Sequence, residues 1–226
     1  MICNCCGSNK FNSEEVLWDK LIQDWSLSEY EVNYINRQQG YTCDHCGSSL
    51  RVIALATAIM RNFNYEGKFK DFVRKRSFKN LKILEINPAG CLSQFFSGFK
   101  KHTLISYPDI DIMTMPYGDQ QFDLIIHSDV LEHVENPVKG LCECYRVLKK
   151  SGICIFTVPI IVDRTTISRI NKVASYHGSS ENNESDLLVH TEYGSDAWKQ
   201  VIQAGFSECR IYSHEYPSAN VLTGVK

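Results

Sequence analysis

Two short cysteine motifs near the N-terminus contain the residues best suited to chemistry. Cys3 and Cys6 are separated by two residues and followed by glycine, and Cys43 and Cys46 repeat this pattern. Each turn presents two thiolates to one cation, and two such turns facing each other provide the tetrahedral sulfur ligands that Zn²⁺ prefers. We therefore expect a structural Zn²⁺ bound by these four cysteines. The alternatives are a site that has lost its metal, or free thiols.

The sequence supports other cysteine chemistry less well. Cys5 and His45 lie inside the motifs and compete as ligands, but they do not repeat the two-residue spacing. A thioredoxin-type site needs one pair in a βαβ context, and a secreted disulfide framework needs a signal peptide, which the first residues do not resemble. The remaining cysteines lie among apolar residues and are predicted to be core side chains: Cys91, Cys142, Cys144, Cys154 and Cys209.

The region after the second motif alternates strand-like and helix-like segments. Strands are predicted at 81–86, 102–106, 122–127 and 153–158, a helix at 138–148, and a terminal hairpin at 209–213 and 221–225. This alternation predicts a parallel sheet with crossover helices, and ligands of such sheets bind beyond the carboxyl ends of the strands. The candidate site therefore lies at residues 87–90, 107–111 and 127–129.

Further helices are predicted on either side of these strands. Ser28 is a good N-cap for a helix at 28–38, and apolar residues at helical spacing predict another at 52–63. Ser195 and Asp196 are predicted to cap a late helix, while the basic stretch 67–79 is predicted to be a solvated linker or helix face. Two groups of side chains receive structural roles: Trp18, Trp25, Tyr30 and Tyr34 as packing aromatics, and Arg146 and Lys149 as a solvated helix face.

Several segments at the strand ends together resemble class I S-adenosylmethionine-dependent methyltransferases of the type 11 group. Residues 81–90 are similar to the first motif of the family, and residues 111–123 resemble its D-x-x-x-L-P-F-x-D-x-x-F-D stretch. Residues 128–134 resemble the family's S-x-V-L-E-H-V run, and residues 143–152 and 157–159 resemble its E-x-x-R-V-L-K-P-G-G and T-V-P segments. A subgroup carries two C-x-x-C-G turns before an arginine-containing helix, which residues 43–51 resemble.

The resemblance implies an α/β fold with a Rossmann-like, seven-stranded, mostly parallel sheet. It further implies a zinc-ribbon-like module at 1–50, a connecting helix and linker at 51–80, and the methyltransferase domain at 81–226. The residues that it assigns to S-adenosylmethionine are Glu85, Asn87, Pro88, Ala89, Asp111, Ile112, His127 and Ser128.

The sequence departs from the family pattern at two points of this cofactor site. Asn87, Ala89 and Cys91 stand where the family has glycines in its first loop. Asn tolerates left-handed backbone angles and Ala is small, so the first two replacements are compatible with binding. The second departure is at residues 106–108, where the family has an acid for the ribose hydroxyls and this chain has none, leaving Asp109 as the nearest acid.

Methyl transfer from a sulfonium is an in-line displacement that needs alignment and, for some acceptors, a base. The candidate bases are His127, His133 and His190. Residues 160–193 follow the strand after which this family builds its acceptor pocket, and residues 178–185 are a candidate for a mobile lid. We expect a small-molecule or carbohydrate-like acceptor. The alternatives are a catalytically degenerate, partner-binding protein and an RNA methyltransferase that grips its substrate with the zinc module.

Composition narrows the class of protein further. The 226 residues are 43% apolar and carry a net charge of −2, which allows a proper core and argues against a broad nucleic-acid-binding surface. The longest apolar run, residues 52–60, is about half of the ~18–20 residues that a membrane span needs. We therefore expect a cytoplasmic protein without a membrane span, and the oligomeric state stays open.

Overall fold

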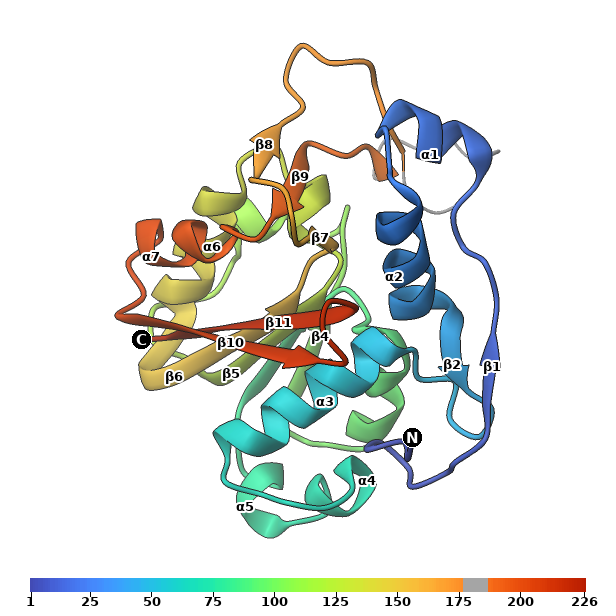
Figure 1. Ribbon diagram of the computed structural model, residues 1–226. Coiled ribbons are helices and arrows are strands. Elements are labelled where there is room, and N and C mark those ends of the chain that lie inside the picture. The colour runs from blue at the N-terminus through green and yellow to red at the C-terminus, as the bar shows by residue number, and fades with distance from the viewer. Residues whose placement is uncertain (177–186) are drawn as a thin grey trace.

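A central sheet organises the protein, whose computed structural model describes residues 1–176 and 187–226 (Figure 1). Its strands lie in the order β10–β11–β6–β5–β3–β4, with parallel pairing from β4 to β6 and antiparallel pairing of β11 with both of its neighbours. The strands are β3 (Ile83–Ile86), β4 (His102–Ile105), β5 (Phe122–Ser128), β6 (Leu148–Thr157), β10 (Glu208–His214) and β11 (Ala219–Val225). The mostly parallel sheet and the terminal hairpin predicted from the sequence are thus confirmed.

The strand count differs from the prediction. Among the described residues this sheet has six strands, not the seven that the family resemblance implies. The segment 106–121 joins β4 to β5 and contains only the single-turn 3₁₀ helix η2 (Ile112–Thr114). A parallel crossover with a strand of its own needs a dozen or more residues on each side of that strand, so this segment is too short to add one.

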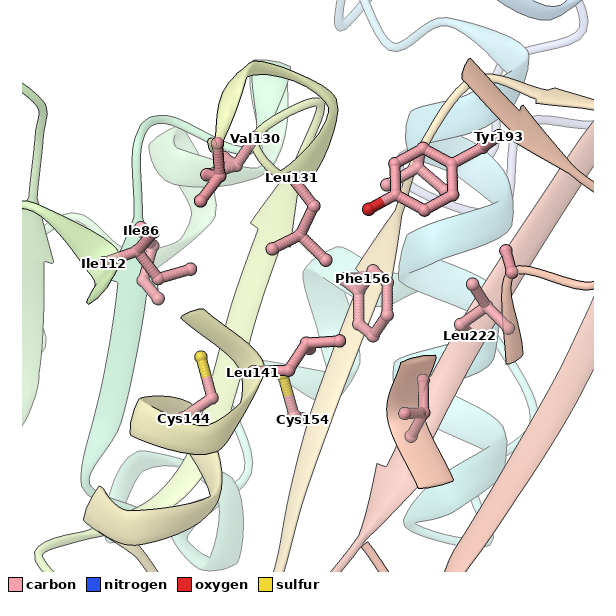
Figure 2. Packing of buried hydrophobic residues seen from close by; sticks show 14 of the residues in the cluster. Ile86, Ile112, Val130, Leu131, Leu141, Cys144, Cys154, Phe156, Tyr193 and Leu222 are labelled. Carbon is pink, nitrogen blue, oxygen red and sulfur yellow. The ribbon is translucent and has the colours of Figure 1, made fainter. Parts of the chain in front are cut away.

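Helices cover both faces of the sheet because successive strand residues point to opposite sides. Leu124 and Ile126 of β5 belong to the core beneath α3 (Leu50–Asn62), whereas Ile125 belongs to the core beneath α6 (Pro137–Val147) and α7 (Trp198–Gln203). Figure 2 shows the second core, where Leu141 and Cys144 of α6 pack over Cys154 and Phe156 of β6.

The basic stretch before β3, predicted as a solvated linker or helix face, forms helices whose basic residues are mostly exposed and whose apolar side packs into the α3 core. It forms the short helices α4 (Phe69–Phe72) and α5 (Arg76–Lys79). Phe69, Phe72 and Phe78 are buried, with the rings of Phe72 and Phe78 4.6 Å apart. The sequence reasoning gave weight to the lysines and arginines of the stretch and did not recognise the spacing of these three phenylalanines. The division of the chain into three parts stays a prediction, since one core contains residues of all three.

The N-terminal part consists of a small two-stranded antiparallel sheet and two helices, which lie between its strands in the chain and run along the edge of the central sheet (Figure 1). They are β1 (Phe11–Ser13), α1 (Asp19–Asp24), α2 (Glu29–Gly40) and β2 (Tyr41–Cys43). The predicted capping box is present, because the Ser28 hydroxyl accepts from Glu31 N–H and the Glu31 carboxylate accepts from Ser28 N–H. Gly40 is required where it stands, since a Cβ there would lie 1.9 Å from a backbone oxygen.

The aromatic side chains of this part pack against the distant segment 160–193, beyond their own module. The Trp25 indole N–H donates to Ser175 Oγ at 2.9 Å, and Tyr34 Oη accepts from Val162 N–H at 3.2 Å. Arg164 adds a bidentate ion pair to Glu31 in α2. These contacts join α1 and α2 to the carboxyl edge of the central sheet.

A second, three-stranded sheet completes that edge. It contains β7 (Ile160–Ile161), β9 (Thr191–Gly194) and β8 (Ile167–Ser168), in that order. The Asp196 carboxylate accepts from Thr166 N–H at 2.6 Å, so it holds this sheet and does not cap α7 as predicted. The proposed lid at 178–185 lies outside the described residues. Nowhere in the described part of the chain is a helix long and apolar enough to cross a bilayer.

Candidate cofactor and acceptor site

Two neighbouring cavities lie beyond the carboxyl ends of the parallel strands. The first, about 400 Å³, is lined by residues that follow β3, β4 and β5 and is called the Asn87 cavity. The second, about 410 Å³, lies between this edge and helices α1 and α2 and is called the Trp18 cavity. Asp129, His133 and Leu187 line both cavities. Two adjoining volumes of this size are suited to a cofactor and a second small molecule.

The first loop after β3 is held in shape by a buried carboxylate. Glu85 is fully buried, and its Oε1 accepts from Ala89 N–H at 2.8 Å while its Oε2 lies 2.7 Å from His102 Nε2. Asn87 has a φ of +52°, and its Oδ1 accepts from Tyr107 N–H at 3.1 Å. The left-handed position in this loop is therefore occupied by Asn without Gly, as the sequence suggested.

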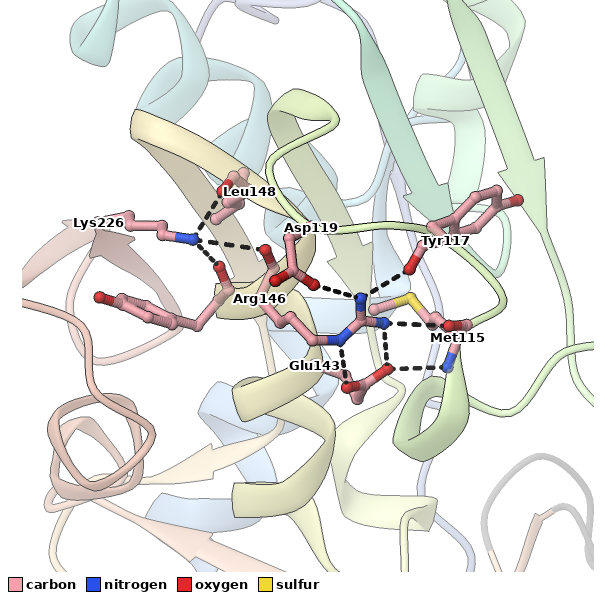
Figure 3. A network of polar contacts seen from close by, with 8 residues as sticks. Met115, Tyr117, Asp119, Glu143, Arg146, Leu148 and Lys226 are labelled. Atoms are coloured by element: carbon pink, nitrogen blue, oxygen red, sulfur yellow. Dashed lines mark hydrogen bonds and ion pairs between the residues drawn. The ribbon is translucent and has the colours of Figure 1, made fainter.

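Asp111 and Ile112 follow β4 on a loop that α6 holds in place. Asp111 Oδ1 accepts from Met113 N–H at 2.7 Å and starts η2. Figure 3 shows how Arg146 fixes the next residues, since its guanidinium donates to the Met115 and Tyr117 carbonyls and pairs with Glu143. The prediction that Arg146 belongs to a solvated helix face was wrong, because its guanidinium donates to two backbone carbonyls of the loop and to the carboxylates of Glu143 and Asp119.

The structure brings only part of the predicted cofactor set to the cavity. Asn87, Asp111 and Ile112 line the Asn87 cavity. The others do not line it: Glu85, Pro88, Ala89, His127 and Ser128. Ser128 Oγ instead hydrogen-bonds Thr157 Oγ1 at 2.8 Å, and Pro88 faces solvent. The cofactor role of all eight residues stays a prediction, with the geometry favouring the first three.

Three lining residues received no cofactor or catalytic role in the sequence reasoning, although Tyr107 and Asp129 lie within its candidate ranges 107–111 and 127–129. Tyr107 lines the Asn87 cavity at the strand end where the family has its ribose acid, whereas Asp109 is exposed and does not line it. Asp129, one residue beyond the predicted Ser128, has a φ of +53° and lines both cavities. Trp18 lines the second cavity. Tyr107 and Asp129 lie directly after strands, and this position was the sequence signal that could have identified them as lining residues.

A group of charged residues lies where the two cavities meet. Arg51, the second residue of α3, forms an ion pair with Asp129. Glu132, in the 3₁₀ helix η3 (Leu131–His133), is fully buried, and neither of its carboxyl oxygens has a hydrogen-bond partner among the described residues. Burial, and after it the nearby Asp129 carboxylate, raises the pKa of Glu132 well above its ordinary value.

The three candidate bases differ sharply in position. His133 lines both cavities, and its Nδ1 lies 3.0 Å from the Leu188 carbonyl oxygen. Nδ1 therefore carries a proton and donates to this carbonyl, and Nε2 is the ring nitrogen that lies 3.9 Å from Glu132 Oε1. His190 lines the Asn87 cavity only. His127 is fully buried and stacks on Phe156 with ring centres 4.6 Å apart, away from both cavities.

The burial of His127 predicts a specific pH dependence of stability. Burial lowers the pKa of His127 from 6.5 to about 3, so the folded protein keeps the ring neutral while the unfolded chain protonates it below 6.5. The stability from this group is complete above pH 6.5 and is lost as the pH falls towards 3. Near pH 5 the loss is about 2 kcal/mol, at about 1.4 kcal/mol per pH unit.

Replacing His127 by Leu is expected to remove this dependence. Urea unfolding gives the free energy of unfolding of both proteins at pH 7 and at pH 5. The difference between variant and parent should shift by about 2 kcal/mol in favour of the variant when the pH is lowered from 7 to 5. The matched control, His214→Leu, replaces a half-buried histidine on β10 and should change the pH dependence less. Equal pH slopes for His127→Leu and its parent would refute the neutral buried ring.

The four predicted metal ligands come together at the other end of α2. The sulfur atoms of Cys3, Cys6, Cys43 and Cys46 lie within 4.8 Å of one another. Cys3 and Cys46 are 3.7 Å apart and Cys6 and Cys43 are 3.6 Å apart. A tetrahedral Zn²⁺ with sulfurs at about 2.3 Å sets them ~3.8 Å apart, so these two separations match the spacing that this ion requires.

The two cysteine turns have matching backbone geometry. Gly7 N–H donates to the Cys3 carbonyl at 2.7 Å and Gly47 N–H donates to the Cys43 carbonyl at 2.8 Å. Both glycines have positive φ, +90° for Gly7 and +69° for Gly47, which explains the glycine after each motif. The fifth nearby thiol, Cys5, is outside this group.

Comparison with known proteins agrees with the class that the fold and the strand-end residues indicate. A family model described as "Methyltransferase domain" matches residues 68–156, which run from α4 to β6. A probable S-adenosylmethionine-dependent methyltransferase of Mycolicibacterium smegmatis is 29% identical over 63 residues, 26% of this chain. The chain spans about a quarter (24%) of the length of that curated relative. The matched segment is less than half of the chain, and it is similar to a methyltransferase domain.

Two solved structures are also similar to the chain. A SAM-dependent methyltransferase from Thermotoga maritima aligns with a TM-score of 0.45 and 15% identity, covering 77% of this chain and 89% of that one. The 1,6-didemethyltoxoflavin-N1-methyltransferase of Burkholderia thailandensis aligns with a TM-score of 0.45 and 8% identity, covering 78% of each chain. The latter was solved with 1,6-didemethyltoxoflavin and S-adenosylhomocysteine bound.

Proposed function

We propose that this protein transfers a methyl group from S-adenosylmethionine to a small-molecule or carbohydrate-like acceptor. The observation that carries the proposal is the Asn87 cavity, which is lined by three of the residues that the family resemblance assigns to the cofactor. The family match over residues 68–156 supports the same class of activity. None of the protein's own described side chains fills this cavity, so its volume of about 400 Å³ can accept a ligand.

The residues around the Asn87 cavity suit a nucleoside with an amino-acid tail. One oxygen of Asp111 caps η2, and the other is available to accept from an adenine amino group. Ile112 and Met113 supply apolar surface for a purine ring, and Asp129 supplies a carboxylate for an ammonium group. When bound, S-adenosylmethionine supplies an electrophilic methyl group on its sulfonium.

His133 is the histidine best placed to act on an acceptor. It lies at the junction of the two cavities, so it can face both a molecule in the Trp18 cavity and the cofactor region. In this proposal Nε2 takes a proton from the acceptor as the nucleophile attacks, which is the role of a general base. His127 lies away from both cavities and is expected to have no part in proton transfer.

The catalytically degenerate alternative loses part of its support. It depended on the missing glycines of the first loop, yet Asn87 adopts the left-handed conformation and Glu85 holds the loop through Ala89 N–H. Ala89 is buried and does not line the Asn87 cavity, so its methyl group does not occupy that volume. The proposal includes a structural Zn²⁺ on the four cysteines, supported by their sulfur spacing.

Replacing Asp111 by Asn tests the cofactor site directly. The amide oxygen can still accept from Met113 N–H, but the amide N–H₂ would then face the adenine amino group, donor against donor. Isothermal titration with S-adenosylhomocysteine should show affinity weakened by about tenfold or more, the size expected for loss of one charge-assisted hydrogen bond. Asp109→Asn, two residues away and exposed, is the matched control and should bind normally. Absence of binding to the folded parent protein would contradict the proposed function.

A further inference from the structure

We propose that the acceptor is a small apolar amine, held in the Trp18 cavity with its nitrogen against Glu132 and His133. This inference rests on the proposed methyltransferase function, and it narrows the acceptor to one chemical class. It follows from the origin of the cavity walls, from the buried carboxyl at the base and from the charges around it.

The walls of the Trp18 cavity come from two parts of the chain that are distant in sequence. Trp18 directly precedes α1, Leu21 lies in α1 and Ile35 lies in α2. Pro159 and Ile161, on the opposite part of the chain, follow β6. The stretch between the cysteine motifs therefore forms one wall of a cavity at the carboxyl edge of the sheet. This explains why it carries so many aromatic and aliphatic residues for a connection between two metal-binding turns.

The lining is apolar except at its base. Gln39, Asp129, Glu132 and His133 are the polar residues that line it in the described part of the chain. A carbohydrate needs hydrogen-bonding partners around its whole circumference, since each unpaired hydroxyl in an apolar site is costly. A hydrocarbon ring or chain with one polar group matches this distribution better.

Glu132 is the feature of the base that indicates an amine. It is fully buried and both of its carboxyl oxygens lack a hydrogen-bond partner among the described residues, although such buried groups are nearly always satisfied. Arg51 is already paired with Asp129, and the His133 Nε2 lies 3.9 Å from the nearer Glu132 oxygen. A ligand ammonium or amine N–H would supply the missing donor and compensate the local excess of carboxyl groups.

The same arrangement accounts for the proton balance of N-methylation. A bound ammonium passes one proton to His133 Nε2, which acts as the base in this proposal, and this leaves an amine with a free lone pair. That lone pair forms the new C–N bond to the methyl carbon while the carbon–sulfur bond breaks and its electrons stay on sulfur. The products are a methylated ammonium, which Glu132 can still accept from, and the neutral thioether of S-adenosylhomocysteine.

Tryptamine and its neutral isostere tryptophol (indole-3-ethanol) test the inference by calorimetry with S-adenosylhomocysteine present. Wild type should bind tryptamine about tenfold or more tighter than tryptophol, because the hydroxyl of tryptophol offers Glu132 a neutral donor and only the amine offers a charged one. Glu132→Gln should remove this preference and leave tryptophol unchanged. Trp18→Leu should weaken both probes without weakening S-adenosylhomocysteine, because Trp18 lines only the second cavity. Trp198→Leu, an exposed tryptophan on α7, is its matched control and should change neither.

The outcomes separate this inference from the function on which it rests. If S-adenosylhomocysteine binds and the two indoles bind equally, or tryptophol binds tighter, or neither binds, the amine assignment is overturned and the methyltransferase proposal stands. If tryptamine binds with the stated preference but S-adenosylhomocysteine does not bind, the proposed function fails and the amine site remains. An unchanged tryptamine preference in Glu132→Gln would also overturn the assignment.

Discussion

Replacing Cys43 by Ser is expected to release one Zn²⁺ per chain and to lower the melting temperature by about 10 °C or more. Structural zinc sites contribute strongly to folding, and a domain of this size loses about 2–4 °C in Tm for each kcal/mol. The effect should extend beyond the cysteine turns, because Cys3 and Cys43 share one buried core with α3 and with Ile83 of the central sheet. Loss of the metal therefore removes a support of the main core.

Metal analysis of the purified protein and thermal unfolding of the two forms measure this effect. The parent protein should contain close to one zinc per chain and the Cys43→Ser variant close to none. Cys142→Ser changes an exposed thiol on α6 and is the matched control, expected to keep both the metal and the melting temperature. A parent protein that contains no metal and is as stable as its Cys43→Ser variant would refute the zinc assignment.

The cysteine turns also connect to the candidate site through α3. This helix begins at Leu50, four residues after Cys46, and its second residue is Arg51. Arg51 pairs with Asp129, which lines both cavities. The position of the cysteine turns thus sets the position of the Arg51 guanidinium. The Cys43→Ser variant should therefore bind S-adenosylhomocysteine less tightly than the parent, by more than its larger unfolded fraction explains. The ion pair with Asp129 explains why an arginine follows the second cysteine motif.

Local signals in the sequence were sufficient for most elements. The strands at β3, β4, β5 and β6 follow from short runs of β-branched and aliphatic residues, and the cap of α2 follows from Ser28 and Glu31. The cysteine spacing predicted which four sulfurs come together. Each of these signals depends on neighbours in sequence, which is why a single chain reveals them.

Features that depend on distant segments could not be predicted in this way. The Trp18 cavity exists because α1 and α2 reach β7 and η3, about ninety or more residues later in the chain. The sequence reasoning assigned the same aromatics to the packing of a small module, and tertiary packing decided otherwise. The six-strand sheet of the described residues has a different cause, since the family pattern implied a seventh strand and the short segment 106–121 has no room for one.

Replacing His133 by Gln is expected to lower the rate of methyl transfer by about 10²–10⁴-fold, the usual contribution of a general base. The Gln amide can still donate to the Leu188 carbonyl, 3.0 Å from Nδ1 in the parent, so the side chain should stay in place. It cannot accept a proton at neutral pH. Binding of S-adenosylhomocysteine should change little, because the variant keeps Asn87, Asp111 and Ile112.

Transfer of labelled methyl groups from S-adenosylmethionine to tryptamine and phenethylamine, followed from pH 5.5 to 9, distinguishes catalysis from positioning. Parent activity should fall on the acid side as the base becomes protonated, and His133→Gln should lose that pH dependence together with its rate. His127→Leu is the contrasting variant, expected to keep its neutral-pH rate because His127 lines neither cavity. A His133→Gln variant that retained both the rate and the acid limb of the parent would exclude His133 as the base and leave His190 as the remaining candidate, since it lines the Asn87 cavity.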